Sequence, residues 1–139
     1  MKQFIVLAAV LPILLLFLSQ YCLDQKNNQM INVFQQQVYA AKEEAKQEGC
    51  FTAAIKDKLR KNLSRTLGVS PEEILIEATE TKQYRLSYFD EGGKRGMIHY
   101  RISFPLHKVM AGERLLGLAA EENTRLYSVE GSTASECLP

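Results

Sequence analysis

The chain begins with an apolar segment whose pattern has no break. Between Phe4 and Leu18 no side chain is charged or polar, and Asp24 is the first acidic residue. A helix over residues 4–23 would be about 30 Å long, which matches the hydrocarbon core of a bilayer. We therefore expect residues 1–23 to form a transmembrane anchor. The residues expected to anchor it are Phe4, Leu7, Leu11, Pro12, Leu15, Leu18 and Tyr21.

A cleaved signal peptide is the competing interpretation, because it also starts with a short basic stretch and an apolar run. Cleavage requires small residues near the cut, and bulky Gln20 and Tyr21 suit that position poorly. The sequence thus favours an uncleaved anchor. Lys2 precedes the segment and Lys26 is the only base soon after it. The positive-inside rule then predicts a single-pass protein of the cell membrane with a cytoplasmic N-terminus and an extracytoplasmic body.

Residues 24–49 are expected to form an amphipathic stalk helix that continues the anchor. No Gly or Pro occurs between Asp24 and Glu48, and Gly49 is placed to end the helix. Apolar residues recur at spacings of three and four, which predicts one apolar stripe. The candidate stalk interface within this stripe is Met30, Phe34, Val38 and Ala41. Such a stripe must bury against something: we expect part of it to pack on the chain's own sheet and the membrane-proximal part on a partner's helix. The alternative is that the chain's own body covers all of it.

Residues 50–139 are expected to form the body. Thr52 is a candidate N-cap for a second helix that Gly68 ends, and Ser70 to Glu73 can form at most one helical turn. From Ile74 onward the period of the apolar positions changes from 3.6 to 2, which predicts strands. The alternating runs are Ile74, Ile76 and Ala78; Tyr84, Leu86 and Tyr88; Ile98, Tyr100, Ile102 and Phe104; and the last strand, Arg125 to Glu130.

Turn residues set the expected limits of these strands. Residues 90–96 are typical of a hairpin loop, and Pro105 is expected to end the third strand. Residues 106–120 are ambiguous, with a turn of helix possible between Val109 and Leu116. The predicted class is α+β: a long membrane-plus-stalk helix and a second helix, packed on a small antiparallel sheet.

Charge adds little to this picture. The 139 residues include 17 Lys and Arg against 16 Asp and Glu, a net charge of +1. This balance gives no general attraction to nucleic acid. The second helix carries a run of bases, which is either a solvated helix face or a patch for anionic lipid or an acidic partner. These bases are Lys56, Lys58, Arg60, Lys61 and Arg65.

No pattern of chemically active residues indicates an enzyme. His99 and His107 are the two histidines, and neither lies in a nucleophile or metal motif, so we expect no cofactor and no metal. Cys22 lies at the membrane boundary, where it acts as a small apolar residue or, alternatively, as an acylation site. Cys50 and Cys137 form a possible disulfide if the body is outside the cytoplasm.

The order of elements is similar to that of type IV pilins and pseudopilins: a membrane helix, an unbroken stalk and an antiparallel sheet. The C-terminal half resembles the TadE-like minor pseudopilins of the tight-adherence pilus. There a strand leads into a proline, then an apolar segment with Leu-Gly, then a last strand ending in Glu. The matching stretches here are Ile98 to Pro105, Leu115-Leu116-Gly117, and Arg125 to Glu130.

The resemblance does not extend to the prepilin processing site, which needs a small residue at the cut and a Glu five residues beyond. Lys2-Gln3 precedes the apolar run here, and the run contains no acid. The resemblance implies a non-enzymatic, pseudopilin-like component of a pilus or secretion assembly, with protein partners along the stalk. The alternative is a membrane-anchored extracytoplasmic sensor or solute-binding module, which predicts a concave pocket with convergent polar groups.

Overall fold

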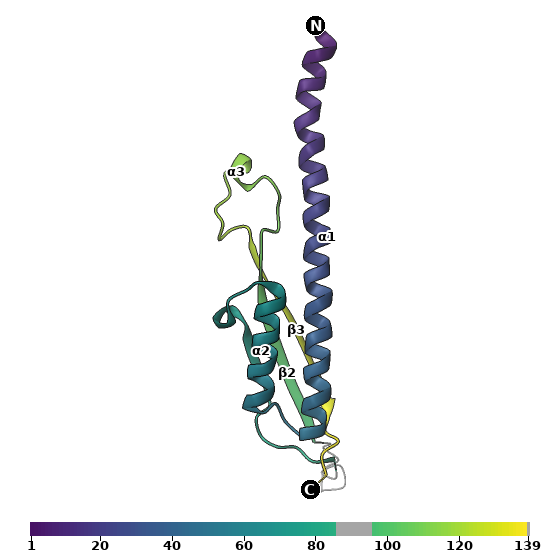
Figure 1. The fold of residues 1–139 in the computed structure, drawn as a ribbon, viewed down its shortest axis with the longest axis vertical. Coiled ribbons are helices and arrows are strands. Elements are labelled where there is room, and N and C mark those ends of the chain that lie inside the picture. Colours follow the sequence, from purple (N-terminus) through teal and green to yellow (C-terminus); the bar gives the residue numbers. More distant parts are fainter. Residues whose placement is uncertain (86–95, 139) are drawn as a thin grey trace. The chain divides into compact units, whose positions relative to one another are not determined.

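The computed structural model describes residues 1–85 and 96–138, and its class is α+β, as predicted (Figure 1). A long helix comes first, then a shorter helix, and then a three-stranded antiparallel sheet with order β1-β2-β3. The elements are α1 (Lys2–Glu48), α2 (Ala53–Leu67), the 3-10 turn η1 (Pro71–Glu73), β1 (Leu75–Ala78), β2 (Met97–His107), α3 (Glu113–Leu116) and β3 (Thr124–Ala134).

The chain divides into two compact units. The N-terminal unit consists of Met1–Ile31 and Leu106–Arg125, and the body unit consists of Asn32–Pro105 and Leu126–Pro139. Three elements, α1, β2 and β3, contribute residues to both.

Both helices of the body unit end where the sequence places a glycine. Gly49 follows α1 at a φ of 90°, and a Cβ there would lie 2.6 Å from the carbonyl oxygen of Gln83. Only glycine fits that left-handed position without displacing backbone. At the start of α2 the Thr52 hydroxyl accepts a hydrogen bond from the N–H of Ile55, and Gly68 closes the helix at a φ of 68°. The predicted caps of α2 are therefore confirmed.

The core of the body unit lies between its helices and one face of the sheet. From α1, Phe34 is fully buried and packs on Phe104 of β2 with ring centroids 4.5 Å apart. Val38, Ala41 and Ala45 of α1 are buried as well. The apolar face of α2, which the sequence predicted correctly, completes the helix contribution. The buried residues of that face are Ile55, Leu59, Leu63 and Leu67. From β2, Ile98 and Ile102 complete the layer, as their alternation predicted.

The strand limits differ from the sequence prediction in three places. β2 continues through Pro105 to His107, because its pairing with β1 covers only the stretch from Tyr100 to Ser103. Pro105 lies beyond that pairing, where its missing N–H costs no bond to β1. The last strand is longer than predicted and runs over Thr124–Ala134. Tyr84 lies outside the strands, whereas Leu86, Tyr88 and most of the predicted 90–96 loop lie outside the described residues.

Candidate functional site

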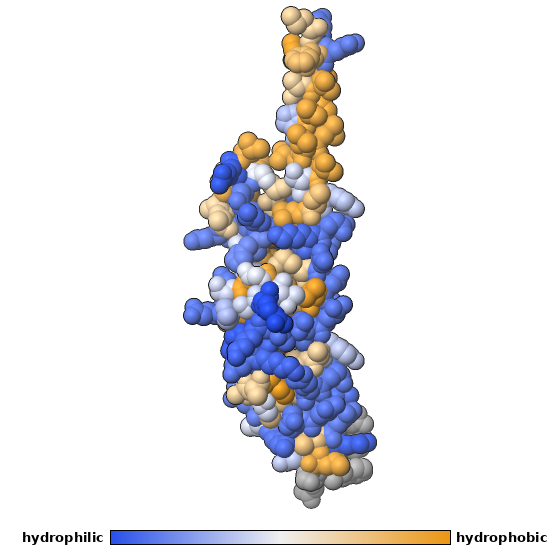
Figure 2. All heavy atoms as spheres, in the orientation of Figure 1, coloured by the Kyte–Doolittle hydropathy of each residue, from blue (hydrophilic) through white to orange (hydrophobic). Residues whose placement is uncertain are grey.

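Most of the apolar N-terminal end of α1 is exposed (Figure 2), with Leu16 partly covered. Phe4 is 74% exposed, Leu11 51% and Leu18 61%. Leu7, Leu15 and Tyr21 are exposed as well, and Pro12 lies inside the helix without ending it. This is the one helix in residues 1–85 and 96–138 that is long and apolar enough to cross a membrane. It is therefore compatible with a single-pass membrane protein.

The apolar stripe of the stalk is covered by the chain itself. Phe34, Val38 and Ala41 are 0%, 2% and 6% exposed, all within the body unit. Of the four candidate interface residues, Met30 alone keeps part of its surface, at intermediate burial. These three residues are thus buried against the chain's own body. A partner could reach their side chains only if the core opened.

The opposite side of α1 is exposed, and its one neighbouring charge among the described contacts is Lys42, whose Nζ lies 4.1 Å over the ring of Tyr39. Asn32, Gln36 and Tyr39 recur at spacings of four and three and are all exposed, Tyr39 at 60%. We call these three residues the amide face. Along the helix no charged residue occurs between Lys26 and Lys42, which is unusual for a solvated helix surface. The apolar pattern of the sequence does not predict this face, whereas the uncharged run of Asn and Gln residues does indicate it.

A loop of the N-terminal unit, residues 106–125, is fastened to α1 by amide side chains. Gln20 donates to the carbonyl oxygen of Val109 (3.0 Å) and accepts from the N–H of Ala111 (2.8 Å). Asn27, 9% exposed, donates to the carbonyl oxygen of Lys108 (3.3 Å). Gln20 and Asn27 stand fourteen and seven residues before Phe34, a spacing that keeps polar residues on the buried side of a helix. That spacing was the signal for a polar partner.

Asn123 holds the loop together from inside. Its side chain is 3% exposed; it accepts from the N–H of Met110 (2.7 Å) and donates to the carbonyl oxygen of the same residue (2.9 Å). It also donates to a carboxylate oxygen of Glu113 (2.9 Å). The side chain therefore replaces a neighbouring strand as the partner of this backbone.

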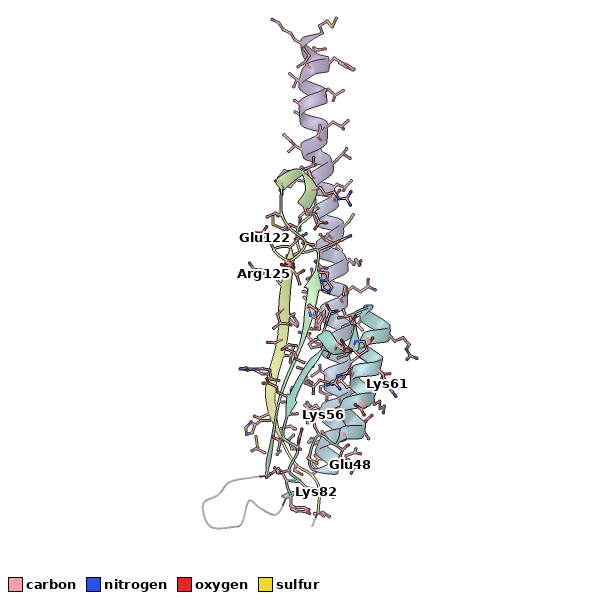
Figure 3. All side chains as sticks on the ribbon, turned by 90° about the vertical axis from the view of Figure 1, so that its left-hand side faces the viewer. Glu48, Lys56, Lys61, Lys82, Glu122 and Arg125 are labelled. Atoms are coloured by element: carbon pink, nitrogen blue, oxygen red, sulfur yellow. The ribbon has the colours of Figure 1, made fainter. Side chains whose placement is uncertain are left out.

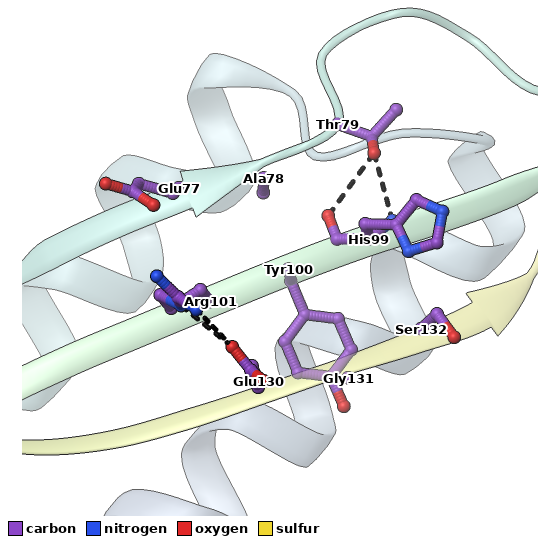
Figure 4. A pocket seen from close by; sticks show the side chains of 9 residues that line it. All are labelled: Glu77, Ala78, Thr79, His99, Tyr100, Arg101, Glu130, Gly131 and Ser132. Carbon is purple, nitrogen blue, oxygen red and sulfur yellow. Dashed lines mark hydrogen bonds and ion pairs between the residues drawn. The ribbon is translucent and has the colours of Figure 1, made fainter.

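The sheet carries a hollow of about 620 Å³ on the face that is turned away from the helices (Figure 4). Arg101 crosses it to Glu130, with 2.6 Å between guanidinium nitrogen and carboxylate oxygen. The hydrogen bond and the charge of Glu130 raise the pKa of Arg101. Thr79 fixes the rim, because its hydroxyl accepts from the backbone N–H of His99 (2.9 Å). The charges at the centre of the hollow thus bind each other.

The basic face of α2 is largely paired within the body unit. Lys56 contacts Glu80, Lys58 contacts Glu44, and Arg60 lies near Asp57. Figure 3 shows Lys61 on the side of α2 that points away from the sheet. The pairing favours a solvated helix face over a binding patch.

The C-terminal tail is fastened to the end of α1 within the body unit. Glu136 donates its backbone N–H to the carbonyl oxygen of Lys46 (2.9 Å), and its carboxylate lies 2.9 Å from the ammonium group of Lys46. The hydrogen bond from the Lys46 ammonium group to this carboxylate, together with the charge of Lys46, lowers the pKa of Glu136. Ser135, 3% exposed, donates to the carbonyl oxygen of Gln83 (2.6 Å).

The three cysteines are separate thiols in this structure. Cys22 is exposed near the end of the apolar segment, Cys50 is buried, and Cys137 is partly buried. The Cβ of Cys137 lies 3.1 Å from the position that a Cβ on Gly49 would take, next to Cys50 in the chain. The fold therefore brings the neighbourhoods of Cys50 and Cys137 together.

The two histidines lie in different surroundings. His99 is exposed on the open face of the sheet, and a ring nitrogen of His107 lies 3.4 Å from the hydroxyl of Thr124. In the described part of the chain no three His, Cys, Asp or Glu side chains form a group that could hold a metal ion. The chain matches no protein-family model, no curated protein and no solved structure.

Proposed function

We propose that this chain is a non-enzymatic, single-pass membrane protein that acts as a pseudopilin-like component of a pilus or secretion assembly. Its N-terminus is cytoplasmic and its body extracytoplasmic. The observation that carries the proposal is α1, a helix that runs without a break from an exposed apolar end into the core of the body unit. That is the order of parts in pilin-like subunits, which the sequence resembles.

The exposed apolar end needs an apolar environment. Phe4, Leu11 and Phe17 are each more than half exposed, and lipid or the membrane helices of partners would remove them from water. A helix satisfies its own backbone groups in lipid, so the segment can enter a bilayer without rearrangement.

Contacts between subunits belong on the amide face, since the apolar stripe is already used inside the chain. Asn32 and Gln36 offer both donors and acceptors, so helices that carry such side chains can bond across an interface without bringing like charges together. Tyr39 adds an exposed aromatic ring, a residue type enriched at interfaces. This replaces the stalk interface expected from the sequence with the opposite side of the same helix.

Photocrosslinking in intact cells tests the assembly. The full chain would carry a photoreactive residue at Asn32 or Gln36, with Lys61 on α2 as the matched exposed control. We expect both stalk positions to form adducts with other membrane-anchored assembly subunits, identified by mass spectrometry, and Lys61 to form few. Equal labelling at all three positions, or none at the stalk positions, would contradict the proposal.

The sensor or solute-binding alternative would use the hollow on the open face of the sheet. Arg101 and Glu130 bind each other there, but both side chains are more than half exposed, so the pair would resist a charged ligand only weakly. Tyr100 contributes to the lining but reaches toward Gly131, where a Cβ would lie 2.7 Å from its hydroxyl.

A further inference from the structure

The tip of the 106–125 loop exposes apolar side chains that its own unit does not cover. Leu115 is 80% exposed, Leu116 57% and Met110 47%. Gly112 and Gly117, at φ of 75° and 70°, flank the single turn of α3 and present the two leucines together. Arg114 lies beside them and is exposed. An apolar tip with a neighbouring cation fits the boundary between acyl chains and phosphate groups.

The loop is fastened to the apolar segment of α1. A Cβ on Gly112 would lie 2.7 Å from a methyl carbon of Leu16, and Gln20 bonds to the backbone of Val109 and Ala111. The expected anchor ends at Leu23. Leu16 stands seven residues earlier, a distance of about 10 Å along the helix. If residues 4–23 cross a bilayer, Leu16 lies about 10 Å inside the end of the hydrocarbon core, so the loop reaches past the headgroups to the acyl chains.

The backbone polar groups of the loop at residues 109–111 are hydrogen-bonded within the protein, which suits an environment with little water. All three N–H groups of residues 109–111 are bonded, to Asn123 and Gln20, and so are the carbonyls of Val109 and Met110. Irregular backbone can approach hydrocarbon only when its polar groups are satisfied by protein. The same bonds satisfy the polar side chain of Gln20, which lies inside the expected anchor and would be costly to leave unpaired in lipid.

We infer that Met110, Leu115 and Leu116 form a second membrane contact, which enters the acyl chains of the bilayer beside α1. This inference rests on the membrane anchor of the proposed function but not on the assembly. The occupant is phospholipid, because the loop is continuous in space with the segment expected to cross the bilayer.

Tryptophan quenching by brominated lipid tests the contact directly, since the chain contains no Trp. The full chain would be reconstituted in phosphatidylcholine–phosphatidylglycerol vesicles with a single Trp at one position: L115W, L116W, F17W in the apolar segment, or L75W on β1. Leu75 is 53% exposed and serves as the matched apolar control in the body unit.

We expect F17W, L115W and L116W to lose fluorescence and shift to shorter wavelength, while L75W stays unquenched. Quenching of F17W alone would overturn the loop contact and leave the anchor intact. Equal quenching of L75W would overturn the specificity of the loop. An unquenched F17W would overturn the anchor, the proposed function and this inference together.

Discussion

Phe34 is the largest side chain that α1 contributes to the core of the body unit. Its ring is fully buried and lies against both Phe104 and Tyr127, with centroids 4.5 and 5.8 Å away. The Phe34→Ala variant should lose about 3–5 kcal/mol of unfolding free energy, because it leaves a cavity that the helix cannot collapse. Urea unfolding in detergent measures this.

The matched control is Tyr39→Ala, five residues along the same helix and 60% exposed. We expect it to change the free energy of unfolding by no more than about 0.5 kcal/mol. Similar losses for the two variants would mean that the stripe is not the buried side of α1.

Cys50 and Cys137 are predicted to pair when the body folds in an oxidising compartment. The bond would close a loop of most of the body and add about 3–5 kcal/mol of stability, with the two electrons passing to a thiol oxidant of that compartment. Titration of the denatured, unreduced protein should find one thiol, and three after reduction, since the chain has three cysteines. A Cys22→Ser variant should then show none before reduction; two would count against the bond.

At the scale of elements, the 106–125 loop depends on one side-chain amide. Asn123→Asp keeps the shape but removes both amide hydrogens, so the carbonyl oxygen of Met110 loses its donor and two carboxylates meet at Glu113. We expect the local stability of the loop to fall by about 1–3 kcal/mol.

Hydrogen exchange of the peptide amides in residues 106–125 measures this change. Asn28→Asp, on an exposed part of α1 in the same unit, is the control and should leave the exchange of the loop unchanged. Unaltered protection in Asn123→Asp would show that the amide is not what orders the loop.

The tail of the body should respond to acid. The pKa of Glu136 is lowered in the folded protein by its bond to Lys46, so this pair stabilises the fold above the unfolded pKa, about 4.3. The contribution disappears as pH falls through the lower folded value. Urea unfolding at a series of pH values should therefore show Lys46→Met less stable than the parent at neutral pH, with the difference vanishing in acid. Lys61→Met should show no such trend.

Local signals were enough to predict the helices but not their contacts. Thr52 and Gly68 cap α2 through neighbours three and four residues away, so the sequence carries the whole signal. The loop's contacts join Gln20 to Val109, 89 residues apart, and no local pattern encodes that pairing. The long β3 and the hollow beside it likewise depend on which strands meet. The sequence predicted the apolar stripe of α1, but the surface that covers most of it comes from the same chain.

At the scale of the whole molecule, the apolar segment is expected to hold the protein in a membrane. Leu11→Arg combined with Leu15→Arg places two charges where each costs about 2.5–3.5 kcal/mol of membrane insertion. We expect the double variant to be released from membranes by alkaline extraction, whereas the unchanged chain stays. Leu75→Arg, in the body unit, is the control and should remain membrane-bound.

The fastening of Glu136 to Lys46 also sets an order of events during synthesis. The two residues are 90 positions apart, so Glu136 is synthesised long after Lys46. Until then α1 can already be helical, but the body lacks the segment that closes it. Contacts of such long sequence separation form slowly, because chain entropy must be lost first. The body therefore completes its fold later than α1 can form, when the tail has been made and reaches Lys46.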